Sequence, residues 1–375
     1  NVLDSVYRDN ATSLYDIAAA TLALEKHFSP RWSLKAGAKY TRNDMRNDAL
    51  YEYHRGDAWL RNERQSFTIN YTENIAAAYA IASAKLGAVS FVAGVRGEYT
   101  HTTGKGVGQD YFSLFPNASL SWSVSEQKGW SLIAQYARTI ERPRFWSLSL
   151  QRMQLSDYTF QTGNPSLDPS FKHDVSLTLV AAHKYTLTAG VQIVNDEIQQ
   201  TMKADSENPD LLQVAWVNYD ATKGYYLSVN LPFQPAKWWQ LNADITYMRR
   251  GQRVEQHGAE EFFDRGLVNL STTLTLPAKF YIDLSYRYQS RIDLGNCWVN
   301  PDHRLQAGVK KRFGDRFTAS FSVQNLLDQG QVIGARGDGF VRTVDARQTW
   351  SNRTYRIGVT WNFKSGKAFK RKAVE

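Results

Sequence analysis

The chain has 375 residues, of which 42% are hydrophobic and 13% aromatic, and its formal net charge is +9. It contains no run of about 18 apolar residues, which excludes a helical membrane protein. The basic residues are scattered apart from one cluster at Lys370-Arg371-Lys372. The charge balance therefore does not favour nucleic acid as a partner.

The N-terminal residues show no apolar core of a signal peptide. We expect either that a signal peptide has been removed or, as the preferred interpretation, that the sequence begins partway through a larger protein. A soluble protein of this length usually divides into two or three domains. No linker or shift in composition divides this chain, so we expect one unit over residues 1–363, followed by a basic tail at 364–375.

Apolar and polar residues alternate with a period of two along most of the chain. Phe280, Ile282 and Leu284, for example, alternate with Tyr281 and Asp283. This period places each set on one face of a β-strand. The same pattern occurs near residues 31–42, 89–102, 129–138, 185–196, 225–233, 239–247, 267–276, 280–289, 303–311, 316–325 and 354–363. Helical spacing prevails nowhere over a comparable length, so the sequence predicts an all-β fold.

Aromatic residues on the apolar face recur eight residues apart within four of these segments. At about 3.3 Å per residue this separation spans roughly 26 Å, close to the height of about 25 Å of the apolar band of a membrane barrel. A soluble sandwich or solenoid also alternates but has no reason to keep this distance. We therefore predict a transmembrane antiparallel β-barrel whose membrane-interface aromatics are Trp32, Tyr40, Phe91, Tyr99, Trp239, Tyr247, Phe280 and Tyr288, with Trp361 and Phe363 on the last strand.

The connections between the predicted strands alternate between short and long. Tight turns are predicted near 29–30, 87–88, 126–128, 183–184, 235–236, 277–278 and 314–315. Longer polar loops are predicted near 44–63, 103–109, 142–170, 204–211, 251–261, 293–301 and 329–345. Bacterial barrels have short periplasmic turns and long extracellular loops.

Pairing turns with loops gives seven hairpins and a final single strand, or about fifteen strands. Bacterial single-chain barrels have an even number. We therefore expect about seven further strands and a plug domain ahead of this sequence, which would complete a plugged barrel of about 22 strands. The tail at 364–375 is then expected to be periplasmic.

A weak repeat begins several strands just after a short turn, as in Leu34-Lys35-Ala36-Gly37 and Leu187-Thr188-Ala189-Gly190. The glycine falls on the polar face each time. Glycine in a strand permits close approach of another group or eases coiling. We interpret the repeat as architecture.

Residues 111–177 carry an ordered set of motifs. Leu114-Phe115-Pro116 precedes a strand, a second strand ends in Glu141-Arg142-Pro143, and Gly163-Asn164-Pro165 and Asp168-Pro169 precede a third. This order resembles the barrel of TonB-dependent receptors, particularly the outer-membrane protein β-barrel family, and the resemblance covers roughly residues 64–363.

The chemistry of these motifs favours a role in shaping a loop. Proline cannot donate to a strand ladder, and Gly-Asn-Pro and Asp-Pro sequences form turns. The motif residues that we interpret as structural are Arg142, Pro143, Gly163, Asn164, Pro165 and Pro169. The final Trp361-Asn362-Phe363 resembles the terminal aromatic signature of such barrels, although twelve residues follow it.

The resemblance implies a receptor in the outer membrane of a Gram-negative bacterium, surrounded by lipid and lipopolysaccharide. It implies active import of a scarce solute, with TonB acting through a plug that this sequence does not contain. Two alternatives stay open at this point. One is a passive porin or an adhesin-like, surface-binding barrel without a plug, and the other is a soluble β-solenoid or sandwich.

No catalytic constellation, nucleotide fingerprint or metal spacing is present, so we expect neither an enzyme nor a cofactor. Rigid aromatics and arginines contribute most binding energy at recognition surfaces. The candidates for solute binding in the extracellular loops are therefore Arg144, Trp146, Tyr158, Trp216, Tyr219 and Trp298. The alternative is aromatic packing between loops, or arginines that pair with lipopolysaccharide phosphates. Cys297 cannot form an internal disulfide and is expected to be an incidental loop thiol.

Overall fold

The computed structural model describes residues 6–63, 66–104, 107–149, 152–156, 158–205, 208–253, 258–337, 340–346 and 353–363. The tail predicted at 364–375 lies outside these ranges. No helix within them is long and apolar enough to cross a membrane.

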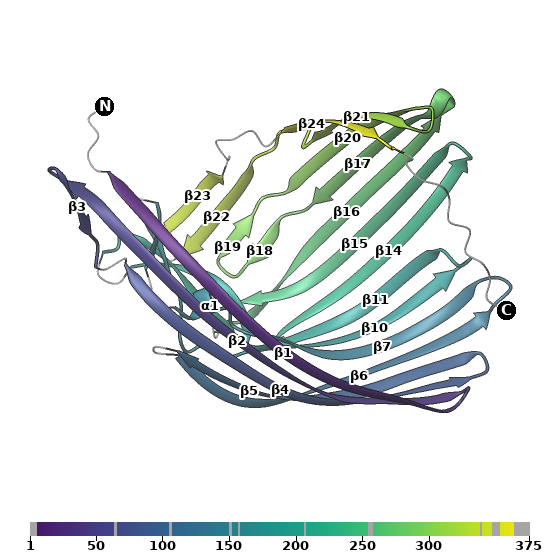
Figure 1. Cartoon of the computed structure of the whole chain (residues 1–375), viewed down its shortest axis with the longest axis horizontal. Coiled ribbons are helices and arrows are strands. Elements are labelled where there is room, and N and C mark those ends of the chain that lie inside the picture. Colours follow the sequence, from purple (N-terminus) through teal and green to yellow (C-terminus); the bar gives the residue numbers. More distant parts are fainter. Residues whose placement is uncertain are drawn as a thin grey trace.

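One antiparallel sheet of sixteen strands curves around a hollow and forms most of the molecule (Figure 1). Fifteen of its strands follow one another as neighbours, in agreement with the predicted number, and β3 (Ala58–Arg61) pairs with the end of β2. The fifteen are β1 (Tyr7–Ser29), β2 (Trp32–Arg55), β4 (Phe67–Leu86), β5 (Val89–Gly104), β6 (Val107–Ser125), β7 (Trp130–Glu141), β10 (Ser170–Ala181), β11 (Tyr185–Asn195), β14 (Thr222–Ala236), β15 (Trp239–Arg253), β16 (Glu260–Leu276), β17 (Phe280–Gln289), β20 (Asp302–Phe313), β21 (Phe317–Gln324) and β24 (Thr354–Trp361).

The apolar residues of the alternating segments point away from the hollow. Among the predicted interface aromatics, Trp239 and Tyr288 are half-buried. The others are exposed, namely Trp32, Tyr40, Phe91, Tyr99, Tyr247, Phe280, Trp361 and Phe363. Large exposed apolar side chains over a whole face are what a lipid-facing surface requires.

The outward tyrosines near the long-loop end bond to polar groups beyond them. The hydroxyl of Tyr40 donates to Asn74 at 2.7 Å, and that of Tyr99 donates to Asp110 at 2.8 Å. In both pairs the acceptor is on the next strand. Asn74 is directly opposite Arg42 and Asp110 is directly opposite His101, each two residues beyond the tyrosine toward the long loops. A tyrosine with its ring on apolar neighbours and its hydroxyl on a polar group is suited to an apolar–polar boundary.

The tight turns lie at one end of the sheet, where the predicted positions agree with the structure except between β14 and β15. That turn was predicted at 235–236, but β14 continues to Ala236, which pairs with Trp239 after a shift in register. The turn is therefore at 237–238. Proline at 235 is tolerated because the register shift removes the need for its donor.

Two of the predicted long loops are wrong, because strands continue through them. β2 extends to Arg55 through the loop expected at 44–63, and β5 pairs with β6 as far as Gly104 and Val107. Within β2, ion pairs link Arg42 to Asp44 at 2.6 Å and Arg46 to Asp48 at 2.7 Å on the outward face. A strand beyond the apolar band carries polar residues on both faces, so its sequence has the composition of a loop.

The predicted loops at 142–170, 293–301 and 329–345 contain folded structure at the opposite end from the tight turns, strands β12 and β13 flank the loop predicted at 204–211, and β15 and β16 extend into both ends of the loop predicted at 251–261. A mixed sheet has the order β12–β13–β9–β8 and a second sheet the order β18–β19–β22–β23. Their strands are β8 (Met153–Ser156), β9 (Thr159–Thr162), β12 (Glu197–Ala204), β13 (Leu212–Tyr219), β18 (Ile292–Leu294), β19 (Cys297–Val299), β22 (Gln331–Gly337) and β23 (Phe340–Ala346), and the short helix α1 (Phe145–Leu148) precedes β8.

The main sheet is open between its first and last strands. Among the described residues, β1 pairs only with β2 and β24 pairs only with β21. Every side chain of β1 is exposed. Each of these strands therefore presents one unpaired row of backbone N–H and C=O groups, which is costly in lipid.

Two of the repeated glycines lie under tyrosine rings on the inner face. Gly37 is directly opposite Tyr79, and Gly190 is directly opposite Tyr226. A methyl group added at either glycine would overlap the tyrosine ring. At these two positions, close packing of a ring on a strand glycine supports the interpretation of the repeat as architecture.

We predict that Gly190→Val destabilises the sheet by about 1–3 kcal/mol, because overpacking outweighs the strand preference of valine. Gly266→Val is the matched control, because nothing lies within 4 Å of a Cβ added at that strand position. The temperature of heat-modified gel mobility should fall for Gly190→Val alone. Equal shifts for the two variants would contradict the packing role of the tyrosine.

Candidate solute-binding site

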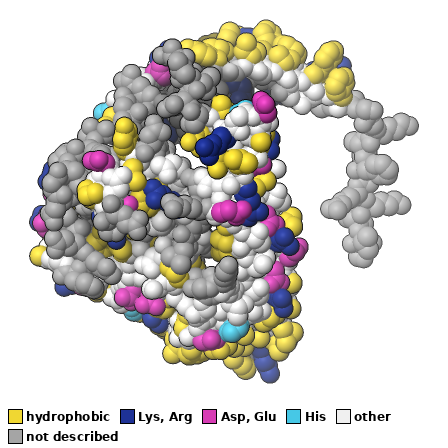
Figure 2. Space-filling view, turned by 90° about the vertical axis from the view of Figure 1, so that its left-hand side faces the viewer, with side chains coloured by type: hydrophobic (Ala, Val, Ile, Leu, Met, Phe, Trp, Pro, Cys, Tyr) yellow, Lys and Arg dark blue, Asp and Glu magenta, His cyan; other side chains and the backbone are white. Residues whose placement is uncertain are grey.

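The long-loop end of the molecule is hollowed and lined with charged and polar side chains. Figure 2 looks into this end and shows charged side chains around the hollow and hydrophobic side chains along the outer surface. Both loop sheets and α1 lie at this end (Figure 1). It is therefore the region where a solute arriving from the loop side would first meet the protein.

Two of the predicted binding residues contact each other. The rings of Trp146 and Trp216 pack edge to face with centroids 4.7 Å apart. Trp216 also packs on a small core of Leu148 and Leu167, and its indole nitrogen is buried without a partner among the described residues. Trp146 stays 45% exposed. Trp146 is therefore available to a solute, whereas Trp216 supports it from below.

The Gly163-Asn164-Pro165 motif joins α1 to β13. The amide of Gly163 donates to Ser149 O and that of Asn164 donates to Ser147 O, both at 2.7 Å. The side-chain amide of Asn164 donates to Trp216 O at 3.0 Å. The motif therefore holds Trp216 next to α1, and Pro169 immediately precedes β10. These contacts belong to loop shaping.

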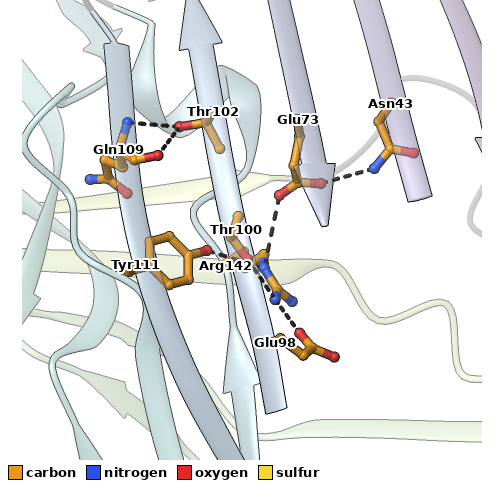
Figure 3. A network of polar contacts seen from close by, with 8 residues as sticks. All are labelled: Asn43, Glu73, Glu98, Thr100, Thr102, Gln109, Tyr111 and Arg142. Atoms are coloured by element: carbon orange, nitrogen blue, oxygen red, sulfur yellow. Dashed lines mark hydrogen bonds and ion pairs between the residues drawn. The ribbon is translucent and has the colours of Figure 1, made fainter. Parts of the chain in front are cut away.

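Arg142 is at the centre of a polar network on the inner wall (Figure 3). It follows β7 and forms an ion pair with Glu98. The same guanidinium donates to the Tyr111 hydroxyl at 3.1 Å and to Thr100 Oγ1 at 3.2 Å, and it lies 3.8 Å from Glu73. The side chain of Arg142 is only 22% exposed, so the network excludes most water.

Neighbouring residues complete this network and connect it to the loops. Asn43 donates to Glu73 at 2.8 Å, and Arg96 forms an ion pair with Glu98. Gln109 donates its side-chain amide to Leu167 O at 2.7 Å, which links β6 to the 163–169 motif. The two arginines and the two glutamates balance in charge. The network therefore anchors the loop and leaves no charge for a ligand.

The remaining predicted binding residues are spread over the loops. Tyr158 is 61% exposed, and Arg144 is exposed just before α1. Tyr219 is only 2% exposed and lies under the turn at Gly295, where burial raises its pKa. Trp298 covers Gly334. Of the six candidates, the structure therefore leaves Arg144, Trp146 and Tyr158 most accessible.

Asn296, which the sequence reasoning missed, connects the two loop sheets. Its side-chain oxygen accepts from Met202 N at 3.1 Å, and its side-chain nitrogen donates to Met202 O at 2.5 Å. The amide thus pairs with β12 as a strand residue would. Only its Gly-Asn turn sequence signalled it, and a turn sequence does not identify a distant partner. Within the described ranges, no group of three or more His, Cys, Asp or Glu residues could hold a metal ion.

Comparison with known families identifies the fold. The profile of the outer membrane protein beta-barrel family matches residues 1–361. This chain belongs to that family. Family membership places the protein in the outer membrane, as predicted, and the resemblance seen in the motifs of residues 111–177 is confirmed. A comparison with curated protein sequences finds no match.

Several solved receptors and transporters share the fold of this family member. The ferric enterobactin receptor PfeA of Pseudomonas aeruginosa is 15% identical with a TM-score of 0.63, and the alignment covers 94% of this chain and 55% of PfeA. The copper transporter OprC is 13% identical with a TM-score of 0.67, covering 94% and 57%. The ferric-catecholate import receptor Fiu of E. coli K12 is 13% identical with a TM-score of 0.62, covering 95% and 55%.

This chain therefore spans little more than half the length of these receptors. At such low identity the likeness concerns the fold. The similar proteins are receptors and transporters, which agrees with the expectation that this family member is not an enzyme.

We predict that Arg142→Met lowers the free energy of unfolding by about 2–3 kcal/mol, because it removes one of the two arginine partners of the largely buried Glu98 carboxylate. Arg46→Met is the control, since that side chain is 57% exposed and its ion pair contributes little. The measurement is the denaturant midpoint of the full-length protein in detergent. Similar losses for both variants would contradict the anchoring role.

Cys297 should react slowly with alkylating reagents. It is only 8% exposed, and burial raises the pKa of its thiol to about 11. Because this pKa lies above its ordinary range, the thiol stays protonated at pH 8. Alkylation should therefore be about 100-fold slower than for an exposed cysteine. A Lys203→Cys, Cys297→Ser protein supplies that exposed cysteine on neighbouring β12. Equal rates in a time course followed by mass spectrometry would show that Cys297 is accessible.

Proposed function

We propose that this chain forms the larger part of the barrel wall of a TonB-dependent receptor that imports a scarce solute. The observation that carries the proposal is the folded loop structure at the hollow end of the sheet. Two loop sheets joined through Asn296, with α1 packed beside them, form a fixed surface over the lumen. Capture of a solute needs such a surface, whereas a passive pore needs an unobstructed opening.

The open edges support a larger barrel. Unpaired backbone groups on β1 and β24 would cost several kcal/mol each in lipid, which supports pairing of these edges with further strands. We propose that about seven strands and a plug contributed by the rest of the protein complete a barrel of about 22 strands. In this arrangement residues 1–363 are barrel and 364–375 are a periplasmic tail.

The outward face supports a defined position in the membrane. The apolar band would lie between the aromatics near the tight turns, such as Trp32 and Phe91, and the tyrosines near the long loops, such as Tyr40 and Tyr99. Beyond those tyrosines, Arg42 and Arg46 point outward. We propose that lipopolysaccharide phosphates lie at this level, because guanidinium groups bind phosphate strongly.

TonB dependence can be tested by comparing spent growth medium from three strains of the native host. These strains are the wild type, a deletion of the gene for the full-length protein, and a strain lacking TonB. Mass spectrometry should find at least one solute that only the wild type removes from the medium.

Two outcomes would contradict the proposal. Removal of that solute by the TonB-deficient strain, but not by the gene deletion, would make the protein a passive pore. Identical media from the wild type and the gene deletion would exclude import and favour a surface-binding barrel.

A further inference from the structure

Four strands that are neighbours in the sheet each place one arginine on the inner face near the long loops. They are Arg250 on β15, Arg265 on β16, Arg287 on β17 and Arg304 on β20. Arg287 and Arg304 are directly opposite each other in the register. Like charges in directly opposed positions destabilise a sheet, so the row requires compensation.

Two members of the row are neutralised within the protein. Arg250 forms an ion pair with Glu197 at the start of β12, and Arg304 forms one with Asp302 at 2.7 Å. The nearby Arg291 is also paired, with Asp293 at 2.7 Å. In each of these three pairs, a carboxylate of the protein neutralises the guanidinium group.

The other two arginines share one neutral acceptor. Arg265 donates to Gln289 Oε1 at 3.3 Å, and Arg287 donates to the same oxygen at 3.2 Å. Neither forms an ion pair with a carboxylate among the described residues. An amide oxygen accepts hydrogen bonds but carries no net charge. Within the described part of the chain, these two positive charges therefore have no compensating carboxylate.

The geometry around Gln289 fits an oxyanion. Because both guanidinium groups reach the same oxygen atom, a carboxylate or phosphate group near that position could accept from both at once. Gln289 is only 9% exposed, Arg265 is half-buried and Arg287 is exposed, so the pair is fixed at its base and open toward the hollow. A hydrogen bond from a guanidinium to an oxyanion is about twice as strong as one between neutral groups, and an oxyanion here would accept more than one.

We propose that Arg265 and Arg287 form an anion-binding site on the inner wall for a carboxylate or phosphate group of the imported solute. This inference rests on the proposed import function and narrows its substrate class to oxyanions. A neutral solute would leave the two charges uncompensated in a partly dehydrated site, which makes that class unfavourable.

The test of the site is the binding of inorganic pyrophosphate to the full-length protein in detergent. Isothermal titration calorimetry at low ionic strength measures this binding. The wild type should bind saturably. Arg265→Gln with Arg287→Gln should weaken binding at least about tenfold, and Arg265→Lys with Arg287→Lys should retain saturable binding because it keeps the charge. The pair Arg312→Gln with Arg316→Gln, which is exposed at the tight turn between β20 and β21, is the matched control and should bind as the wild type does.

Equal affinity in the wild type and the inner double glutamine variant would overturn the site, as would the absence of saturable binding by the wild type. If that variant instead makes cells permeable to a large antibiotic while pyrophosphate binding is absent, the arginines hold another segment of the same polypeptide. Heat-modified gel mobility verifies that each variant is folded. Solute removal in the three-strain comparison is independent of this result, so failure of the anion site and failure of import are distinguishable.

Discussion

The hydrogen-bond ladder between neighbouring antiparallel strands is the constraint on which the rest of this protein depends. In a lipid environment a backbone N–H or C=O group finds no water, so every strand needs a partner on both sides. From β2 to β21 the sheet satisfies this requirement strand by strand. Among the described strands of this path, β1 and β24 each lack one partner, and this is the physical reason for the proposal that further strands complete the barrel.

The same ladder forces a division of side chains between two faces. Apolar and aromatic residues take the outward face, where lipid accepts them without cost, and polar residues take the inner face. Polar groups on the inner wall must then compensate one another in a partly dehydrated environment. The network around Arg142 does so completely, with its two glutamates and two arginines. The pair Arg265 and Arg287 has only a neutral amide as its acceptor among the described residues, and this contrast within one wall is the basis for proposing a ligand site there.

Loops at one end of this wall form a folded surface, on which the proposed function places solute recognition. Their small sheets bury few residues, and much of their order comes from specific polar contacts such as those of Asn296 and Asn164. Trp216 illustrates the consequence. A residue that pattern alone suggests for recognition is used partly for packing, while its neighbour Trp146 remains accessible. Recognition on this fold therefore depends on which loop aromatics are left over once the loops have folded.

The sequence by itself predicted the number of neighbouring strands in the main sheet and the face that their alternating residues take, because a period of two is a local property that a single segment displays. It did not predict the strands of the two loop sheets. It also located the tight turns, where glycine and proline chemistry acts within a few residues. It misplaced the loops at 44–63 and 103–109, because a strand that leaves the apolar band loses its alternation while keeping its ladder. Only the tertiary structure decided which distant residues meet. Arg142 joins Glu73 and Glu98, Asn296 joins Met202, and Arg265 meets Arg287 across Gln289, since sheet register and loop docking bring together positions that no local pattern relates.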